Sequence, residues 1–384
     1  MVSANAELSI DESSLKTPVK VCLSGDVMIG RGIDQIMPHP CDPRIHEPFM
    51  SSAIDYLHLA EQANGPIARP VNLEYVWGAA LEELRRTRPD AYIINLEVSI
   101  TCSDTYLAKG INYRMSPENA GCLPAAGVDC CVLANNHILD WGNAGLLETL
   151  ATLDYRGIKT SGAGQDLAHA RGPAVLDVAN NQRVIVFAFA SVSSGTPRDW
   201  AATPSGAGVN LLADLSDKCA AQLARSLAEN RRSGDNVIVS LHWGPNWGYY
   251  VPEEQRRFAH RLIDEAGVSA VYGHSSHHAK AIEVYRQRLI LYGCGDFLND
   301  YEGITSYAQY RDDLALLYAA SFDPTSADLI DLEIIPFQIR RFQLNRASSA
   351  DTSWLQQTLD RESHGFGVHI ESKPGGRLMA AWAK

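Results

Sequence analysis

Several apolar runs in this sequence stop abruptly at a polar side chain, and this pattern constrains the fold more than any other feature. The clearest run extends from Cys130 to Ala134 and breaks into Asn135, Asn136 and His137. An unbroken apolar run of this kind is typical of a strand that is buried on both faces. In α/β proteins, ligands collect just beyond the carboxyl ends of such strands. The run therefore predicts a strand that delivers polar groups to a site.

The same ending recurs after other predicted strands, at 20–24, 91–96, 237–241 and 269–272. The polar residues that follow these strands are Asp26, Glu97, His242 and His274. Carboxylates, an amide and imidazoles are the ligands that a hydrolytic metal centre uses. A single histidine at a strand end is more often a hydrogen-bonded residue than a ligand. Five strands with the same ending favour a metal site.

Strand-like and helical segments alternate through the first 280 residues, which predicts α/β layering. After Lys280 the sequence becomes strand-rich, as in an antiparallel or mixed sheet, and a helix near 353–361 is expected to close the chain. We predict a disordered polar N-terminus at 1–18 and one domain with two packed sheets at 19–384. The other predicted elements are helices at 73–87, 117–126, 145–156, 214–232 and 253–266, and strands at 184–190, 281–285, 289–292, 314–322 and 329–343.

Residues 32–70 form a proline-rich segment with one short predicted helix, near Ser51 to Ala63. Long irregular insertions inside a compact domain are usually functional loops. We therefore expect this segment to form a lid over the site.

The charge balance argues against nucleic-acid binding. The chain has 33 lysines and arginines against 45 aspartates and glutamates, a net charge of −12, and no long basic run. It therefore lacks the positive surface that follows a phosphate backbone. An anionic small molecule or polymer can still bind at a local site.

No segment indicates a membrane or secreted protein. The most apolar stretch, Val184 to Val192, is far shorter than the roughly 20 residues that cross a bilayer. The N-terminal residues have neither the basic start nor the apolar run of a secretory signal. The eight cysteines lack CxxC spacing and are expected to be reduced. We expect a cytoplasmic protein without direct membrane insertion.

Two rival chemistries leave no motif in the sequence. There is no Gly-x-Ser-x-Gly turn for a serine hydrolase and no phosphate-binding loop with Gly-Lys-Ser or Gly-Lys-Thr for ATP. Metal-dependent chemistry is the reading that the residues favour.

Six motifs follow one another in the order GDVMIGR, NLEVSIT, LANNHILDWG, SLHWG, GHSSHHAKAIEVY and YGCGDFLNDYEG. In this combination the sequence resembles the CapA/PgsA family, which is associated with poly-γ-glutamate capsule synthesis and is similar to calcineurin-like metallophosphoesterases. The resemblance runs from residue 19 to beyond residue 340. It implies an α/β fold of the metallophosphoesterase type, a four-layer α/β/β/α sandwich with two mixed sheets, and one or two metals between the strand ends.

The resemblance also implies roles for the residues at the strand ends. Asp26 resembles a carboxylate that binds the first metal, and Glu97 resembles a carboxylate that bridges two metals. Asn136 and His242 resemble ligands of the second metal. His274 resembles the first of two paired histidine ligands in the final motif.

His277 matches the second of these paired histidines, so that one is expected on each metal. His137 resembles a general acid or oxyanion stabiliser, and Asp140 is expected to orient its loop. The donor types suit divalent Mn, Fe, Zn or Ni. Such a metal would lower the pKa of a bound water, so that hydroxide rather than a side chain attacks.

Two positions depart from the family pattern. Met28 stands where the phosphoesterases carry a histidine, and a thioether is a poor ligand for a hydrolytic cation, so packing is the favoured reading. The site then holds a single metal or recruits a replacement ligand. In GHSSHH, the extra His278 leaves the ligand choice between His277 and His278 open.

Arg31 and Arg114 are candidates for gripping a carboxylate or phosphate, and His278 is a third candidate for substrate contact. Ordinary salt bridges explain the two arginines equally well. Asp296 is expected to orient a ligating histidine, as Asp300 or Glu302 could, although all three could instead cap loops. The flanking tryptophans are expected to pack in the interior, and they are Trp141, Trp243 and Trp247.

The main hypothesis is a metal-dependent hydrolase that cleaves a phosphoester or an amide such as a γ-glutamyl linkage, with a link to poly-γ-glutamate metabolism. The alternative is a non-catalytic accessory protein of a polymer-synthesis complex, which would use the same cleft to bind an anionic chain. The absence of a histidine ligand at position 28, where Met28 stands, favours the alternative somewhat.

Overall fold

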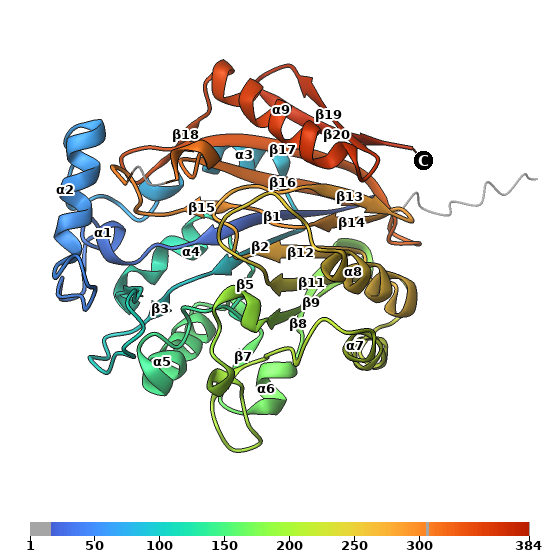
Figure 1. The fold of residues 1–384 in the computed structure, drawn as a ribbon, viewed down its shortest axis with the longest axis horizontal. Coiled ribbons are helices and arrows are strands. Elements are labelled where there is room, and N and C mark those ends of the chain that lie inside the picture. The colour runs from blue at the N-terminus through green and yellow to red at the C-terminus, as the bar shows by residue number, and fades with distance from the viewer. Residues whose placement is uncertain (1–16, 305–306, 384) are drawn as a thin grey trace, which may run out of the picture.

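The structure is a computed structural model that describes residues 17–304 and 307–383. The disordered N-terminus predicted for residues 1–18 therefore lies almost wholly outside the described residues. Two mixed sheets dominate the fold, and helices cover them (Figure 1).

The larger sheet is parallel around its centre and antiparallel toward one edge. β1 runs parallel to β2 and β15 and antiparallel to β16. β15 (Asp296–Leu298) lies beside β1, and β18 (Leu344–Arg346) lies beside β17. The main path is β19 (Val368–Lys373), β20 (Arg377–Trp382), β17 (Leu329–Ile339), β16 (Leu314–Phe322), β1 (Val19–Val27), β2 (Ala91–Leu96), β5 (Cys130–Val132) and β6 (Lys159–Ser161).

The second sheet has a parallel centre and antiparallel edge strands. Its order is β13 (Ile282–Tyr285), β14 (Arg288–Leu291), β12 (Ala270–His274), β11 (Asn236–His242), β9 (Gln182–Ala190) and β8 (Ala174–Val178). Two small pairs complete the strands, β3 (Ser99–Ile100) with β4 (Arg114–Met115) and β7 (Ala163–Gly164) with β10 (Gly208–Val209).

The two sheets pack face to face, and their inner faces share one large apolar core. Tyr272 of β12 crosses this interface and donates a hydrogen bond to the carbonyl oxygen of Ser24 in β1. A second apolar cluster joins the outer face of the smaller sheet to α7 (Asp217–Glu229) and α8 (Glu253–Ala266). Helices α3 (Ala79–Thr87) and α5 (Gly142–Tyr155) pack against the larger sheet. The α/β sandwich expected from the sequence is confirmed.

The shorter helices lie in the connections. α4 (Cys122–Ala125) precedes β5, and α6 (Leu167–Arg171) follows β7. The 3-10 segments are Tyr75–Trp77, Pro117–Gly121, Ala179–Asn181, Val192–Ser194, Arg198–Trp200 and Ala308–Tyr310.

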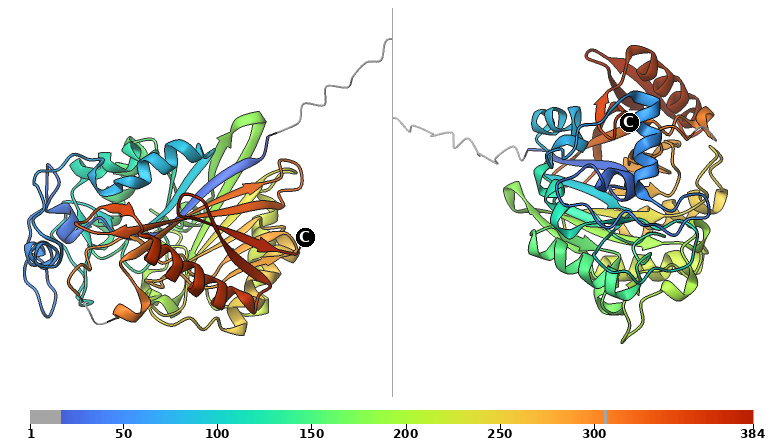
Figure 2. Two further views of the ribbon diagram at one scale, coloured as in Figure 1. Left: turned by 90° about the horizontal axis from the view of Figure 1, so that it is seen from above. Right: turned by 90° about the vertical axis from the view of Figure 1, so that its left-hand side faces the viewer.

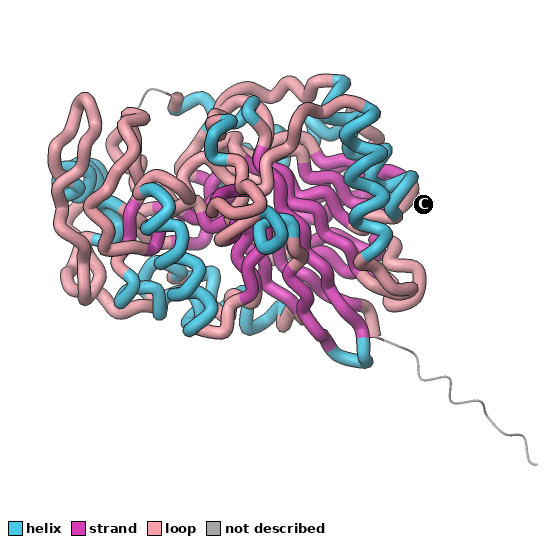
Figure 3. Tube along the Cα trace, turned by 90° about the horizontal axis from the view of Figure 1, so that it is seen from below, coloured by secondary structure: helices cyan, strands magenta, loops and turns pink. Residues whose placement is uncertain are grey.

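Loops gather at the end of the molecule to which the carboxyl ends of the central parallel strands point (Figure 3). β1 leads at this end directly into α1 (Arg31–Asp34). Here α1 and α2 (Ala53–Asn64) interrupt the segment 32–70 (Figure 1). The helix expected near Ser51 to Ala63 is thus present, and Ser52 caps its start by accepting a hydrogen bond from the Ile54 amide. The role of this segment as a lid stays a prediction.

The helix expected near 353–361 is present as α9 (Ser349–His364), but the expectation that it closes the chain is wrong, because two strands follow it. α9 packs on β19 and reaches β13 of the smaller sheet, and Figure 2 shows it lying across the strands. The hairpin of β19 and β20 then extends the larger sheet. Its signals in the sequence are the alternating buried side chains of Val368 and Ile370 and the turn at Gly375 and Gly376.

Other differences are smaller. β8 was not expected, and the strand predicted over 329–343 ends at Ile339, before β18 begins. The strand-rich, antiparallel character after Lys280 is confirmed. All eight cysteines are free thiols, as expected. Within the described ranges, no helix is both long and apolar enough to span a bilayer, and the cytoplasmic location stays a prediction.

Candidate metal centre

Five of the predicted residues meet between the two sheets, and we call them the strand-end cluster: Asp26, Glu97, Asn136, His242 and His274. One ligand atom from each of Asp26, Glu97 and His242 lies within 4.8 Å of the others, and all three residues are buried. Asn136 Oδ1 lies 3.0 Å from His242 Nε2. His274 Nδ1 lies 3.0 Å from Asp26 Oδ1. The structure thus brings together residues from strands of both sheets.

Backbone packing places these side chains. A side chain at Gly25 would put its Cβ 1.7 Å from the carbonyl oxygen of Gly295, so only glycine lets β1 and β15 approach this closely. The Asp26 amide donates to that same oxygen at 2.9 Å. In the smaller sheet, His242 and His274 face each other in the register of β11 and β12.

Several nitrogens of the cluster have no hydrogen-bond partner although they are buried. They are Nδ1 of His242 and both ring nitrogens of His274. A buried, unpaired polar atom costs about 1–3 kcal/mol, so such atoms normally have a partner. The 3.0 Å between His274 Nδ1 and Asp26 Oδ1 lacks hydrogen-bond geometry but equals the spacing of two ligands about 2.1 Å from one cation at right angles. The donor set fits a divalent transition metal.

The charges of the cluster are tuned by burial and by one another. Burial raises the pKa of Asp26, but the close imidazole of His274, with His242 and the hydrogen bond from Asn95, outweighs it, and the net pKa lies below the ordinary range. Burial, with the charge of Asp26 beside it, raises the pKa of Glu97 well above its ordinary value. Burial lowers the pKa of His242 to about 3, against the opposing charge of Asp26. The imidazole of His242 is therefore neutral at pH 7, as a metal ligand must be.

Two asparagines that the sequence reasoning missed hold the carboxylates. The Asn95 amide donates to Asp26 Oδ1 at 2.8 Å and to Glu97 Oε2 at 3.3 Å. Asn135 in turn donates to Asn95 Oδ1 at 3.1 Å and accepts from the His137 amide at 3.1 Å. Asn95 had a readable signal, because it is a polar residue inside the otherwise apolar strand β2.

His137 and Asp140 form a hydrogen-bonded pair beside the cluster. His137 Nδ1 lies 2.7 Å from Asp140 Oδ2, which also accepts from the Tyr113 amide at 2.7 Å. A carboxylate only accepts, so Nδ1 carries the hydrogen. Burial lowers the pKa of His137 to about 4 although Asp140 opposes the shift. His137 Nε2 lies 4.0 Å from Glu97 Oε1, at the side of the cluster.

Lys109 is a further residue that the sequence reasoning missed. Its ammonium group donates to Asp140 Oδ1 at 2.8 Å and to the carbonyl oxygen of Asn136. It lies in a loop with exposed neighbours, and a lone lysine in such a segment gives no signal in the sequence.

His277 is engaged by protein groups on both sides of its ring. Its Nδ1 lies 2.9 Å from Asp296 Oδ1, and its Nε2 lies 3.0 Å from the Asn246 amide nitrogen. Asn299 donates to the other oxygen of Asp296 at 2.8 Å. Burial alone would lower the pKa of His277, but the Asp296 carboxylate outweighs burial and raises it. His278 accepts a hydrogen bond from the Gly248 amide at 3.0 Å.

Ser275 lies between the histidines of this motif in a strained conformation. Its φ of 88° falls in the region that favours glycine. Its amide donates to Asp26 Oδ2 at 3.2 Å, and its hydroxyl donates to the Gly244 carbonyl at 3.0 Å. The strain thus places a backbone donor on the carboxylate of the cluster.

Met28 is fully buried, which fits the packing role expected for it. Its sulfur accepts a hydrogen bond from the Tyr301 hydroxyl at 3.6 Å. That hydroxyl lies 2.8 Å from the hydroxyl of Tyr113. Trp141 and Trp243 are buried, as expected, and Trp247 is partly exposed and stacks on Tyr307.

The two candidate arginines are held by protein groups. Arg31 is buried, pairs with Glu47 and Asp300, and lies between the rings of Tyr56 and Tyr113. Arg114 donates to the carbonyl oxygens of Asp42 and Ser103 and stacks over the ring of Trp141. Contact of either arginine with a substrate stays a prediction.

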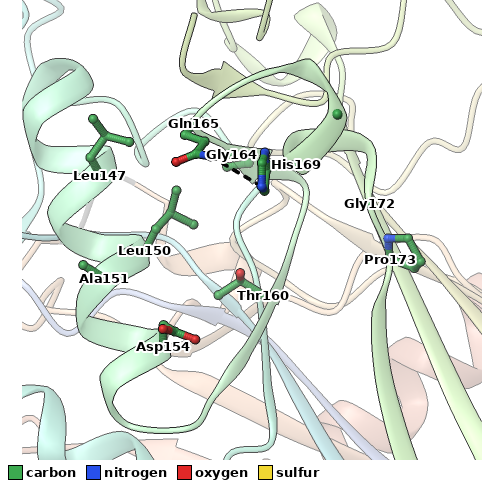
Figure 4. A pocket seen from close by; sticks show the side chains of 12 residues that line it. Leu147, Leu150, Ala151, Asp154, Thr160, Gly164, Gln165, His169, Gly172 and Pro173 are labelled. Carbon is green, nitrogen blue, oxygen red and sulfur yellow. Dashed lines mark hydrogen bonds between the residues drawn. The ribbon is translucent and has the colours of Figure 1, made fainter. Parts of the chain in front are cut away.

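A cavity of 710 Å³ opens elsewhere, between α5 and the segment of β7 and α6. Figure 4 shows Leu147, Leu150 and Asp154 of α5 facing His169 across it. His169 is exposed, and its Nδ1 lies 2.8 Å from Asp166. No residue of the strand-end cluster lines this cavity.

Comparison with known proteins identifies the family of the chain. The family model described as bacterial capsule synthesis protein PGA_cap matches residues 20–301. A probable polyglutamine synthesis accessory protein of Mycobacterium tuberculosis is 46% identical over 362 residues, 94% of this chain and 95% of that protein. The PGA biosynthesis protein CapA of Bacillus subtilis is 26% identical over 70% of this chain and 66% of its own length. The capsule biosynthesis protein CapA of Bacillus anthracis is 23% identical over 63% of this chain and 55% of its own length.

The family match covers well over half of the chain, and it includes the residues of the strand-end cluster. The resemblance to CapA proteins expected from the six sequence motifs is confirmed. The chain belongs to the PGA_cap family of bacterial capsule synthesis proteins.

Proposed function

We propose that this protein is a metal-dependent hydrolase whose strand-end cluster holds a divalent transition metal. The observation that carries this proposal is the buried group of Asp26, Glu97 and His242, with donor atoms within 4.8 Å of one another. The unpaired Nδ1 of His274 supports it, because a cation bound by Asp26 would give this nitrogen a partner. The mixed set of carboxylate, amide and imidazole donors suits Mn, Fe, Zn or Ni.

We propose one metal rather than two. His277 and Asp296 bind each other, and Asn246 and Asn299 engage their remaining atoms. A second cation would have to break these hydrogen bonds. Met28 offers no alternative, since its sulfur is a soft donor that already accepts from a tyrosine.

The bound metal would act as a Lewis acid and lower the pKa of a water molecule. His137 would take up or release a proton at Nε2, which lies at the side of the cluster. Asp140 would hold the ring of His137 in that orientation through Nδ1. The bond cleaved is a phosphoester or an amide of the γ-glutamyl type, and the name of the Bacillus subtilis relative, a PGA biosynthesis protein, favours the amide.

A second candidate is a non-catalytic accessory protein that uses the same cleft to bind an anionic polymer. The name of the Mycobacterium relative, an accessory protein of polyglutamine synthesis, favours it. Both candidates would bind the ligand, but only the hydrolase would cleave it.

Metal analysis of protein purified without added metal tests the proposal together with His242→Ala. We expect about one metal per chain in the wild type and loss of metal in the variant. His369→Ala, at an exposed histidine of β19, is the matched control and should keep the metal. Absence of stoichiometric metal after loading with Mn, Fe, Zn and Ni in turn would refute the metal site.

A panel of aryl phosphates and γ-glutamyl peptides then separates the two candidates. Turnover that disappears in the His242 variant supports the hydrolase. Tight binding of a γ-glutamyl polymer with metal present, and no turnover of any panel member, supports the accessory protein.

A further inference from the structure

Lys109 lies in the loop between β3 and β4, and its side chain extends to the main chain of Asn136 in the strand-end cluster. Its ammonium group donates to Asp140 Oδ1 at 2.8 Å and to the main-chain carbonyl of Asn136. It also lies 3.3 Å from His137 Nδ1. One side chain therefore contacts three residues of the motif that carries both a candidate ligand and the candidate proton-transfer pair.

The donors of this ammonium group can be accounted for one by one. Two hydrogens go to the acceptors on Asp140 and Asn136, and the nitrogen lies 5.0 Å from the ring centre of Trp200, where it makes a cation–π contact. Since His137 Nδ1 gives its own hydrogen to Asp140, it has no lone pair for Lys109 to use. The ammonium group thus engages two oxygen acceptors and the ring of Trp200.

The main chain around Lys109 is fixed to the same place. The Leu107 amide donates to the Asp140 carbonyl at 2.8 Å, and the Asn112 side chain donates to that carbonyl at 3.3 Å. Lys109 therefore approaches Asp140 from a loop that is itself anchored on Asp140. This arrangement gives the long side chain a defined direction.

Burial makes the contact between Lys109 and Asp140 necessary. The Asp140 side chain has no exposed surface, whereas that of Lys109 keeps 21% of its surface exposed. A buried carboxylate needs a compensating charge and a full set of hydrogen bonds. Lys109 supplies the charge, and His137 and the Tyr113 amide supply the remaining hydrogen bonds.

We propose that Lys109 is a positioning residue of this site. By holding the Asn136 carbonyl and the Asp140 carboxylate together, it directs the Asn136 side chain toward His242 and the His137 ring toward Glu97. The purpose given to this positioning, which is catalysis, rests on the proposed hydrolase function. The arrangement itself can be tested in the metal-free protein.

The test compares Lys109→Met and Lys109→Arg with the wild type. Methionine keeps the length of the side chain and removes the charge. Arginine keeps the charge, but its rigid planar fork presents its donors in another geometry than the compact ammonium group of lysine. Lys159→Met, at an exposed lysine of β6, is the matched control.

Two readouts are used on folded protein, checked by circular dichroism. The first is the ring nitrogen NMR signal of His137 in metal-free protein, assigned by its loss in His137→Gln. The second is the affinity for Mn²⁺ alone, measured by calorimetry. We expect the methionine variant to lose the Nδ1–H signature of His137 and to bind Mn²⁺ about 10–100-fold more weakly, as is usual when a partner of a ligand is removed. The arginine variant should fall between it and the wild type.

The proposal is overturned if the methionine variant keeps both the wild-type His137 signal and the wild-type Mn²⁺ affinity. If the methionine variant does not fold, the arginine variant decides, and wild-type values in both readouts overturn the proposal. If the wild type itself binds no Mn²⁺ or other divalent metal, the proposed function fails. The NMR signal still decides whether Lys109 positions His137.

Discussion

His242 should make the metal-free protein lose stability in acid, and the size of this loss follows from its burial. Burial holds the pKa of His242 at about 3, below the ordinary value of 6.5. Between these two values the unfolded chain binds a proton at this position and the folded chain does not. Acidification therefore favours the unfolded chain, so the stability present above pH 6.5 is lost as the pH falls toward 3.

A pH of 5 is 1.5 units below the pKa of about 6.5 of the histidine in the unfolded chain, which is therefore protonated, while the histidine in the folded chain stays neutral. Each unit corresponds to about 1.36 kcal/mol, so His242 alone lowers the free energy of unfolding by about 2 kcal/mol between pH 8 and pH 5. A glutamine at this position cannot titrate. The acid loss of His242→Gln should therefore be smaller than that of the wild type by about 2 kcal/mol.

Urea unfolding at pH 8, 7, 6 and 5 in the presence of a chelator measures this difference. The chelator is needed because a bound metal would itself hold the imidazole neutral. Histidines that do not interact with position 242 titrate alike in both proteins and cancel in the comparison. Equal acid losses in the two proteins would refute the reasoning that His242 is buried and neutral in the folded chain.

Three further predictions concern the site and its surroundings. His137→Ala should keep the metal and lower kcat by about 10²–10⁴-fold, the usual contribution of a general acid or base. Asn136→Ala should instead weaken metal binding, as measured by calorimetry. Retained turnover in the His137 variant would exclude His137 from proton transfer. Arg31→Met should lower the free energy of unfolding in urea by about 3–5 kcal/mol, because it leaves two buried carboxylates without their cation. A loss below 1 kcal/mol would show that this ion pair is dispensable. Limited proteolysis should find residues 32–70 better protected when an anionic substrate is bound, and equal protection would contradict a lid.

The strand-end cluster could be predicted because strand geometry alone brings its members together. Apolar runs mark strands that are buried on both faces, and neighbouring parallel strands end at the same edge of a sheet. For that reason Asp26, on β1, lies beside Glu97, which directly follows β2, and His242 and His274, on β11 and β12, lie side by side. No side-chain detail was needed for this step.

The hydrogen-bond and ion-pair partners of these residues could not be predicted, because they depend on the conformations of the loops. Lys109 lies in a loop whose path depends on tertiary contacts, among them those with the Asp140 carbonyl. Arg31 looked equally suited to an anion or to a salt bridge, and the partner that holds it, Asp300, lies 269 positions away in the chain. Such choices are made by tertiary packing, which local patterns do not encode.

The close approach of β1 and β15, which only Gly25 allows, also governs when the site can exist during protein synthesis. β1 is made first, yet it pairs with β16 in a register that joins Val19 to Phe322, and Asp26 lies opposite Asp296. At a synthesis rate of about 5–20 residues per second, these partners emerge roughly 15–60 s after β1. Until then the central strand of the larger sheet has an unpaired edge, and a chain cut short before residue 296 lacks part of the surroundings of Asp26. Metal binding would therefore report that ribosomes have completed most of the chain.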